Sequence, residues 1–223
     1  MNGSTPTFSE FIPLPLQMKV IRDISRFDYS LGTHEILLSG SVGSSKSILM
    51  AHLIARHCVE NVQANCLIGR RALPDLKETL YKKISEHISD LPQTLYKEYD
   101  NNAEIRFRNG SQVTPRTWAD KKYLKLRSLE LSMAVIEELT ENVGDDAQVY
   151  QEIKMRVGRL PHIGKPLIIS ATNPDAPSHW AYKYFIEPNL GDRKHPTRHV
   201  YYSRTEDNPY LPVSYIEQLK RDL

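Results

Sequence analysis

A glycine- and serine-rich run near residue 40 has the residue types that bind phosphate. Its residues are Gly40, Ser41, Val42, Gly43, Ser44, Ser45, Lys46 and Ser47. Glycines let backbone N–H groups turn toward the β and γ oxygens of a nucleoside triphosphate, and the N-terminus of a following helix adds a positive dipole end. A lysine at the end of such a run reaches the same oxygens, and the next hydroxyl ligates Mg²⁺. The run therefore predicts an ATP-binding loop in which Lys46 contacts the phosphates and Ser47 contacts the metal.

The segments on either side of this loop favour the same interpretation over a chance serine-rich loop. His34–Leu38 is a compact apolar run that predicts a strand, and Ser47–Val59 has apolar residues at helical spacing. Strand, glycine loop and helix are the context that the motif requires. One departure stands out, because Ser45 occupies the place where a glycine usually precedes the lysine. If that place requires a positive φ, the serine is strained by about 1 kcal/mol.

Two adjacent carboxylates follow a second buried strand, predicted over Leu131–Ile136. At the C-terminal edge of a parallel sheet, Glu137 and Glu138 would face the nucleotide crevice. We expect Glu137 to hold Mg²⁺, directly or through water, and Glu138 to polarise the water that attacks the γ-phosphate. The alternative is a solvated acidic surface that continues along the chain, and to that surface we assign Glu141, Asp145 and Asp146.

Apolar runs alternate with helical segments through the rest of the chain. Further strands are predicted over Ala64–Gly69, Ala103–Arg108 and Pro166–Ile169, and helices over Gln17–Arg26, Pro74–Leu91 and Gln148–Val157. Asn109 and Gly110 form the strongest hairpin-turn signal in the chain. The fold class is α/β, a P-loop NTPase of the ASCE/RecA-like kind. We expect a mainly parallel central sheet, helices on both faces, and one strand between the acidic strand and the phosphate-loop strand.

The composition is that of an ordinary soluble globular domain. The 223 residues are 40% hydrophobic and 25% charged, with a net charge of +2. This mild charge is compatible with nucleic acid but requires a local basic patch for it. Cys58 and Cys66 have no zinc-binding or CxxC spacing, which favours two buried residues in a reducing cytosol. No signal peptide and no apolar run of about 20 residues is present, so the sequence predicts a cytosolic protein.

These motifs resemble the N-terminal ATPase domain of the large terminase subunit, the DNA-packaging motor of tailed bacteriophages and herpesvirus relatives. Further family-like segments lie in the same order along nearly the whole chain, at Pro13–Gln17, Leu67–Leu76, Lys125–Glu130, Ile168–Pro174, His179–Pro188 and Glu206–Pro212. The resemblance implies hydrolysis of ATP to ADP and phosphate, coupled to translocation of double-stranded DNA into a procapsid. It also implies a homo-oligomeric ring on the portal protein in the host cytoplasm, the small terminase subunit as a partner, and a monomer in isolation.

The resemblance also assigns roles to three further residues. Gln17 would recognise adenine, although a residue at a helix start can equally be solvated. Asn173, just past a buried strand, would sense the γ-phosphate or the attacking water, although a turn before a proline would also explain it. Arg127 would act as an arginine finger on a neighbouring subunit, although it can also belong to a solvated basic face with Lys121, Lys122 and Lys125. Arg70 and Arg71 are weaker candidates for the same cation.

Two departures from the family pattern shape the expected organisation. Val42 stands where the family often has an arginine, and this sequence contains no counterpart of the family's C-terminal nuclease. We expect an ATPase fragment of a longer protein, the alternative being a naturally short motor. We expect an N-terminal arm with the adenine-binding segment at 1–32, the ATPase core at 33–205, and a linker-like segment at 206–223. A helicase-like DNA-dependent ATPase of the same fold is one alternative. A degenerate nucleotide-binding assembly module, suggested by Ser45 and Glu137, is another.

Overall fold

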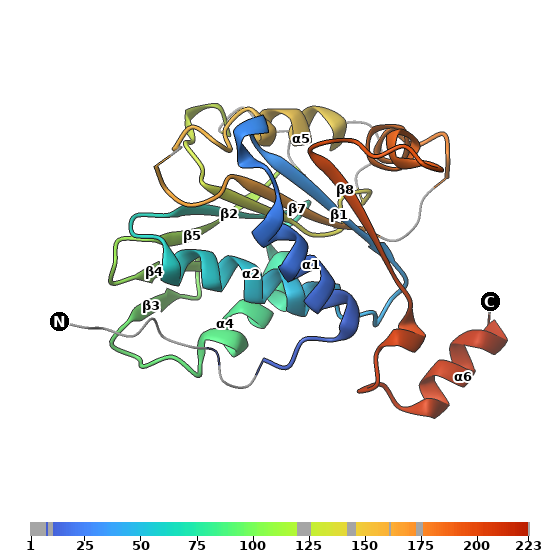
Figure 1. Ribbon diagram of the computed structural model, residues 1–223. Coiled ribbons are helices and arrows are strands. Elements are labelled where there is room, and N and C mark those ends of the chain that lie inside the picture. The colour runs from blue at the N-terminus through green and yellow to red at the C-terminus, as the bar shows by residue number, and fades with distance from the viewer. Residues whose placement is uncertain are drawn as a thin grey trace.

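The core of the protein is one eight-stranded sheet. The computed structural model describes residue 8 and residues 11–119, 126–141, 146–160, 162–172 and 176–222. Strand order is β3-β4-β5-β2-β6-β7-β1-β8 (Figure 1). The pairs from β5 to β8 are parallel, whereas β3–β4 and β4–β5 are antiparallel. The strands are β1 (His34–Gly40), β2 (Asn65–Arg70), β3 (Tyr96–Tyr99), β4 (Glu104–Phe107), β5 (Gln112–Thr117), β6 (Met133–Ile136), β7 (Leu167–Thr172) and β8 (Arg198–Ser203).

Helices cover both faces of this sheet. The helices are α1 (Pro15–Arg26), α2 (Lys46–Glu60), α3 (Leu73–Leu76), α4 (Lys82–Ile88), α5 (Asp146–Lys154) and α6 (Val213–Asp222), and π-helical turns occupy Lys77–Tyr81 and Tyr182–Ile186. Figure 1 shows α1, α2 and α4 on one face and α5 on the other, with α6 extending away from the sheet. Within the described residues, no helix has the length and apolarity needed to cross a membrane.

Side chains along each central strand point alternately to the two faces of the sheet, and so they contribute to two separate cores. Ile36 and Leu38 of β1 join the cluster under α1, α2 and α4, whereas Leu37 joins the cluster under α5. This is the period-two pattern of an extended strand, and both halves are apolar because both faces are covered. The predicted fold class, the mainly parallel sheet, and the strand (β7) that separates β1 from β6 are therefore confirmed.

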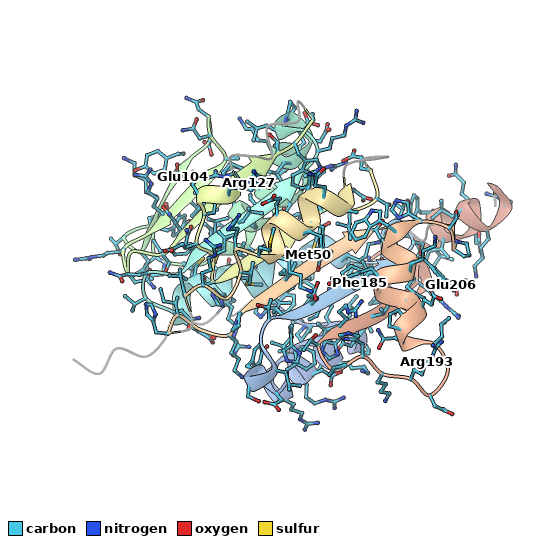
Figure 2. The ribbon with its side chains drawn as sticks, turned by 90° about the horizontal axis from the view of Figure 1, so that it is seen from above. Met50, Glu104, Arg127, Phe185, Arg193 and Glu206 are labelled. Carbon is cyan, nitrogen blue, oxygen red and sulfur yellow. The ribbon has the colours of Figure 1, made fainter. Side chains whose placement is uncertain are left out.

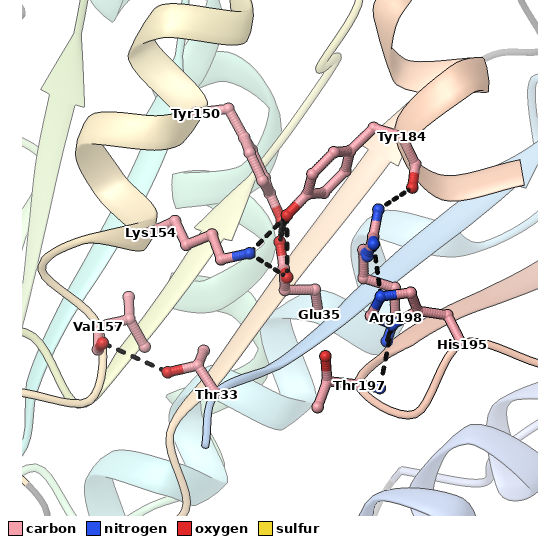
Figure 3. A network of polar contacts seen from close by, with 9 residues as sticks. All are labelled: Thr33, Glu35, Tyr150, Lys154, Val157, Tyr184, His195, Thr197 and Arg198. Atoms are coloured by element: carbon pink, nitrogen blue, oxygen red, sulfur yellow. Dashed lines mark hydrogen bonds and ion pairs between the residues drawn. The ribbon is translucent and has the colours of Figure 1, made fainter. Parts of the chain in front are cut away.

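A buried carboxylate ties the beginning of β1 to the helical layer above it. Glu35 is 1% exposed and accepts hydrogen bonds from Tyr150 (2.7 Å) and Tyr184 (3.0 Å), while Lys154 lies 2.8 Å away (Figure 3). A buried charge is tolerated only when it is paired and hydrogen-bonded, and these three partners meet that condition. The network anchors the strand whose far end carries the phosphate loop.

Several local predictions are confirmed and others are wrong. The hairpin predicted at Asn109 and Gly110 is confirmed: it joins β4 to β5, and Gly110 has a positive φ of 86°. The helix expected over Pro74–Leu91 is confirmed as one continuous helical run from Leu73 to Ile88, but a π turn separates α3 from α4 within it. Strands β3 and β8 were not expected, because each is a short edge strand with several polar residues and no continuous apolar run. Cys58 and Cys66 are buried free thiols, as expected.

Candidate functional site

The phosphate loop leaves β1 in close contact with the neighbouring strand β8. A Cβ at Gly40 would lie 2.1 Å from the carbonyl oxygen of Ser203, so only glycine fits there. Side chains that follow β8 bind the loop carbonyls directly. Thr205 Oγ1 donates to the Val42 carbonyl (2.7 Å) and Asn208 Nδ2 donates to the Gly43 carbonyl (2.7 Å). The loop is therefore braced by residues that lie more than 160 positions away in the sequence.

Ser45 has the positive φ that its position predicted. Its φ of 62° and ψ of 25° are left-handed, and its side chain makes no capping hydrogen bond to α2. Its carbonyl oxygen accepts a hydrogen bond from Nε2 of Gln17 at 3.0 Å, while the other amide atom of Gln17 accepts from the Leu14 N–H at 2.9 Å. Gln17 is 5% exposed, so it is not a solvated residue. It joins the start of α1 to the base of the phosphate loop.

Lys46 lies folded back into the loop. Its ammonium donates to the carbonyl oxygens of Gly40 (2.7 Å) and Ser41 (2.9 Å) and contacts the Ser44 hydroxyl at 3.3 Å. Burial lowers the pKa of Lys46, and the charges of Glu138 and Glu137 oppose that shift. These contacts are to carbonyls and a hydroxyl rather than to a carboxylate, so Lys46 forms no ion pair that a phosphate would have to displace.

The hydroxyl of Ser47 and the carboxylate of Glu137 face each other. Ser47 donates to Oε1 of Glu137 at 2.8 Å, and Glu137 is 4% exposed. A serine hydroxyl and a carboxylate are hard oxygen donors, and Mg²⁺ in nucleotide sites is held by one or two such ligands together with phosphate oxygens and water. The pair therefore fits the metal that the loop motif implies.

Glu138 lies beyond the end of β6 in a left-handed conformation with a φ of 47°. Adjacent strand residues normally point to opposite faces, and this backbone turn instead brings Glu137 and Glu138 to the same cavity. Such a conformation costs a non-glycine residue about 1–2 kcal/mol. The N–H groups of Glu137 and Leu139 hold it in place by donating to the carbonyls of Gly69 and Ala171, both at 2.9 Å. Burial and the charge of Glu137 raise the pKa of Glu138.

Two side chains contact the outer oxygen of Glu137: Arg70, until now only a weaker arginine-finger candidate, and Thr79, which the sequence did not assign to this site. Arg70 at the end of β2 reaches Oε2 of Glu137 at 3.4 Å, and Thr79 on the first π turn also hydrogen-bonds that oxygen. The other edge of the Arg70 guanidinium contacts both oxygens of Glu141, at 3.1 and 3.3 Å. The assignment of Glu141 to solvated surface is therefore wrong: it pairs with Arg70 beside the carboxylates.

The cavity enclosed by these groups has a volume of about 530 Å³. Lys46, Ser47, Glu137 and Glu138 line it together with Arg70. It lies at the carboxyl ends of the parallel strands, where ligands bind in open α/β sheets. The loop residues from Val42 to Ser47 line the same cavity, Ser44 being buried and Val42 60% exposed.

Arg127 is not among the residues that line this cavity. Arg127 is paired with Glu152 at 3.1 Å, and its side chain is 56% exposed. In Figure 2, Arg127 lies well apart from Glu206, the residue that follows the loop-bracing Thr205. The exposed side chain of Arg127 can be reached by another molecule, but its guanidinium is held by Glu152. Asn173 and the lysines at 121, 122 and 125 lie outside the described residues.

The chain is similar to large terminase subunits in sequence and in fold. The phage terminase large subunit family matches residues 33–222. The PBSX phage terminase large subunit of Bacillus subtilis (strain 168) is 26% identical over 204 residues, which are 84% of this chain and 45% of that protein. The large terminase of a thermophilic bacteriophage superposes with a TM-score of 0.74 at 14% identity, over 95% of this chain and 51% of that one. That terminase has also been solved in complex with ADP and with ATP-γ-S.

A third similarity is to an isolated domain. A variant of the large terminase ATPase domain of Thermus phage P74-26 superposes with a TM-score of 0.64 at 13% identity, over 96% of this chain and 88% of that one. The chain thus spans about half the length of the full-length relatives it matches. Because the family match covers far more than half of the sequence, the chain belongs to the phage terminase large subunit family.

Proposed function

We propose that this chain is the ATP-hydrolysing motor domain of a terminase large subunit and that it powers translocation of double-stranded DNA into a procapsid. The observation that carries the proposal is the convergence of Lys46, Ser47, Glu137 and Glu138 on one cavity at the carboxyl edge of the sheet. These are a phosphate-binding cation, two metal-binding oxygens and a general base. Family membership supplies the link from ATP hydrolysis to DNA packaging.

Nucleotide binding exchanges the contacts of Lys46. In place of the carbonyls of Gly40 and Ser41, its ammonium would take the β and γ phosphate oxygens, which are stronger, charged acceptors. The backbone N–H groups of the loop and of the first turn of α2 would bind the remaining phosphate oxygens. Gln17, joined to the carbonyl of Ser45, would contact the adenine edge beside the loop.

The 2.8 Å contact between Ser47 and Glu137 supports these two side chains as the ones that would hold Mg²⁺. Ser47 would ligate it directly, and Glu137 would do so directly or through a water molecule. The ion would supply charge neutralisation on the phosphate oxygens that separate during hydrolysis.

Glu138 is suited to be the base that orients and deprotonates the attacking water. Its raised pKa, caused first by burial and then by the charge of Glu137, brings it closer to the working pH of a base than an ordinary glutamate. Asn173 would position the same water or the γ-phosphate. Arg127, outside its own cavity, would stabilise transition-state charge in a neighbouring subunit of a ring.

In this proposal the chain has three parts and several partners. Residues 1–32 form an arm with the adenine-binding segment, 33–205 the ATPase core, and 206–223 a linker-like segment whose beginning also braces the phosphate loop. The working assembly is a homo-oligomeric ring on the portal protein in the host cytoplasm. Double-stranded DNA and the small terminase subunit are its other partners, and the isolated chain is a monomer.

ATP hydrolysis by the purified chain, measured with and without double-stranded DNA, tests the proposal. Glu138→Gln keeps the shape of the side chain and loses the base, so turnover should fall at least about 100-fold while Mg²⁺–ATP binding persists. Glu137→Gln should instead raise the Mg²⁺ requirement. Normal hydrolysis by Glu138→Gln with an inactive Glu137→Gln would mean that the two roles are exchanged.

ATP turnover, together with assays of DNA-strand separation and of portal binding, separates the alternatives. A wild-type chain without turnover would be a nucleotide-binding module rather than a motor. DNA-strand separation, or failure to bind the portal, would favour a helicase-like ATPase of the same fold. DNA-stimulated hydrolysis without strand separation is the result expected for a packaging motor.

A further inference from the structure

Glu137 accepts hydrogen bonds on both of its oxygens, and only one of them faces the phosphate loop. Oε1 takes the Ser47 hydroxyl at 2.8 Å. Oε2 points to the other side, where it meets Thr79 and, at 3.4 Å, Arg70. With Oε2 held in this way, rotation of the carboxylate about its own axis would break contacts on both sides. The orientation of Oε1 toward Ser47 is thus determined partly by residues outside the phosphate loop.

The groups around the Thr79 hydroxyl favour a hydrogen bond from it to Glu137. Its single proton can go either to Oε2 of Glu137 or to the carbonyl of Asp75, 2.7 Å away. The charged carboxylate is the stronger acceptor, and Arg70 donates to the Thr79 oxygen at 3.1 Å, which favours the same direction. The guanidinium is in turn held by Glu141. The chain of contacts therefore runs from Glu141 through Arg70 and Thr79 to Glu137.

A π turn places Thr79 at this position. The buried residues Leu76, Leu80, Ile84 and Ile88 are all 0% exposed and each is four positions from the next. In a regular α-helix, residues spaced four apart rotate around the helix axis by about 40° from one to the next, or about 120° over this row. The wider turn at Lys77–Tyr81 takes up one extra residue, about 100°, and so keeps the row on the buried face. Thr79 lies at the centre of that turn.

We propose that Thr79 is a positioning residue for the divalent cation: its hydroxyl holds Oε2 of Glu137 so that Oε1 stays aimed at Ser47 and at the metal bound with the nucleotide. The inference rests on the proposed nucleotide- and metal-binding function of the cavity. Hydrogen-bonding partners behind a metal-ligating carboxylate set its direction and tune metal affinity. Loss of the Thr79 hydroxyl would leave Oε2 to Arg70 alone, and the carboxylate could turn toward the guanidinium.

Calorimetric titration of a non-hydrolysable ATP analogue over a series of Mg²⁺ concentrations, and in EDTA, tests this role in the full chain. Thr79→Val removes the hydroxyl with little change of shape and should raise the Mg²⁺ midpoint about tenfold. Affinity in EDTA should be unchanged, because the loop and Lys46 are untouched. Thr79→Ser keeps a hydroxyl and should restore the wild-type midpoint. In steady-state hydrolysis, Thr79→Val should raise the KM for Mg²⁺ with little loss of kcat at saturating metal.

Two controls separate positioning from a general structural effect. Thr114→Val removes a threonine hydroxyl that hydrogen-bonds the Cys66 carbonyl on a strand of the same sheet, and should leave the midpoint unchanged. In a Glu137→Gln background, Thr79→Val should cause no further rise of the Mg²⁺ midpoint, because the two residues act through one contact.

The inference would be overturned if Thr79→Val kept the wild-type Mg²⁺ midpoint, or if Thr79→Ser raised the midpoint as much as Thr79→Val does. An additive rise of the midpoint in the double variant would also overturn it. So would loss of affinity in EDTA. Wild-type chain that binds no nucleotide at any Mg²⁺ concentration would instead refute the proposed function on which the inference rests.

Discussion

Replacement of Ser45 by glycine should stabilise the protein, although it removes a side chain. Ser45 has a φ of 62° and its side chain makes no capping hydrogen bond to α2. A left-handed backbone costs a residue with a Cβ about 1–2 kcal/mol. Glycine removes that cost but adds about 0.4–1 kcal/mol of unfolded-state entropy. The net expectation for Ser45→Gly is a gain of about 0.5–1 kcal/mol, because the hydrogen bond from Gln17 goes to the backbone carbonyl and is kept.

Urea unfolding followed by circular dichroism measures this difference, and a thermal scan should show a rise of about 1–4 °C for a chain of this size. The matched control is Ser85→Gly, inside α4 with ordinary helical geometry. There the same substitution should destabilise by about 0.5 kcal/mol, because glycine is a poorer helix former than serine. Equal destabilisation by the two variants would refute the strain assigned to Ser45. Nucleotide affinity should not fall in Ser45→Gly, since glycine is the usual residue there.

Three further predictions concern the loop, the assembly and pH. Lys46→Ala should abolish nucleotide affinity and turnover, because the β and γ oxygens lose their point charge; wild-type binding by calorimetry would end the loop assignment. Specific ATPase activity should rise with protein concentration or on the portal. Arg127→Ala should remove that rise with ATP affinity intact, and mixing it with Glu138→Gln should restore some activity; flat activity or an inactive mixture would count against a finger in trans. Burial lowers the pKa of His52 to about 3 and of His57 to about 4, so below pH 6.5 the unfolded chain binds more protons than the folded one. The free energy of unfolding, measured in urea, should therefore fall from pH 6.5 toward pH 4, by up to about 1.4 kcal/mol per pH unit for each histidine. In His52→Phe the fall should be smaller. A free energy of unfolding that rises on acidification would contradict this.

Much of the nucleotide site was predictable because its information is local. A strand, a glycine loop and a helix follow one another within 30 residues, and the positive φ of Ser45 follows from its place before the lysine. The turn at Asn109 and Gly110 was recognisable from the residue pair, because Gly110 readily adopts the positive φ that the turn needs. Hydrogen bonds of Asn109 with Cys58 and Gln63 then tie the turn to the end of α2. Continuous apolar runs also identified β6 and β7, since strands covered on both faces need apolar residues on both.

Surroundings of the carboxylates could not be predicted in the same way. Arg70 and Thr79 come from β2 and from the helical run after it, and they reach Glu137 because β2 lies beside β6 in the sheet. Ser47 comes from the other side, from the phosphate loop and the start of α2 after β1, and β7 separates β1 from β6. Glu141 reads as one more acidic residue in a polar stretch, and only its distance to Arg70 makes it part of the site.

Residue types and short-range spacing were enough to identify the α/β class and to predict a phosphate loop and a general base, because both kinds of signal are local. The side chains that hold those groups in position became visible only in the folded structure. Thr205 and Asn208 brace the loop from the far end of the chain, and a π turn aims Thr79 at Glu137. The direction of a carboxylate or a loop carbonyl depends on hydrogen-bond partners within about 3 Å, and strand order brings those partners together without leaving a periodic pattern in the sequence.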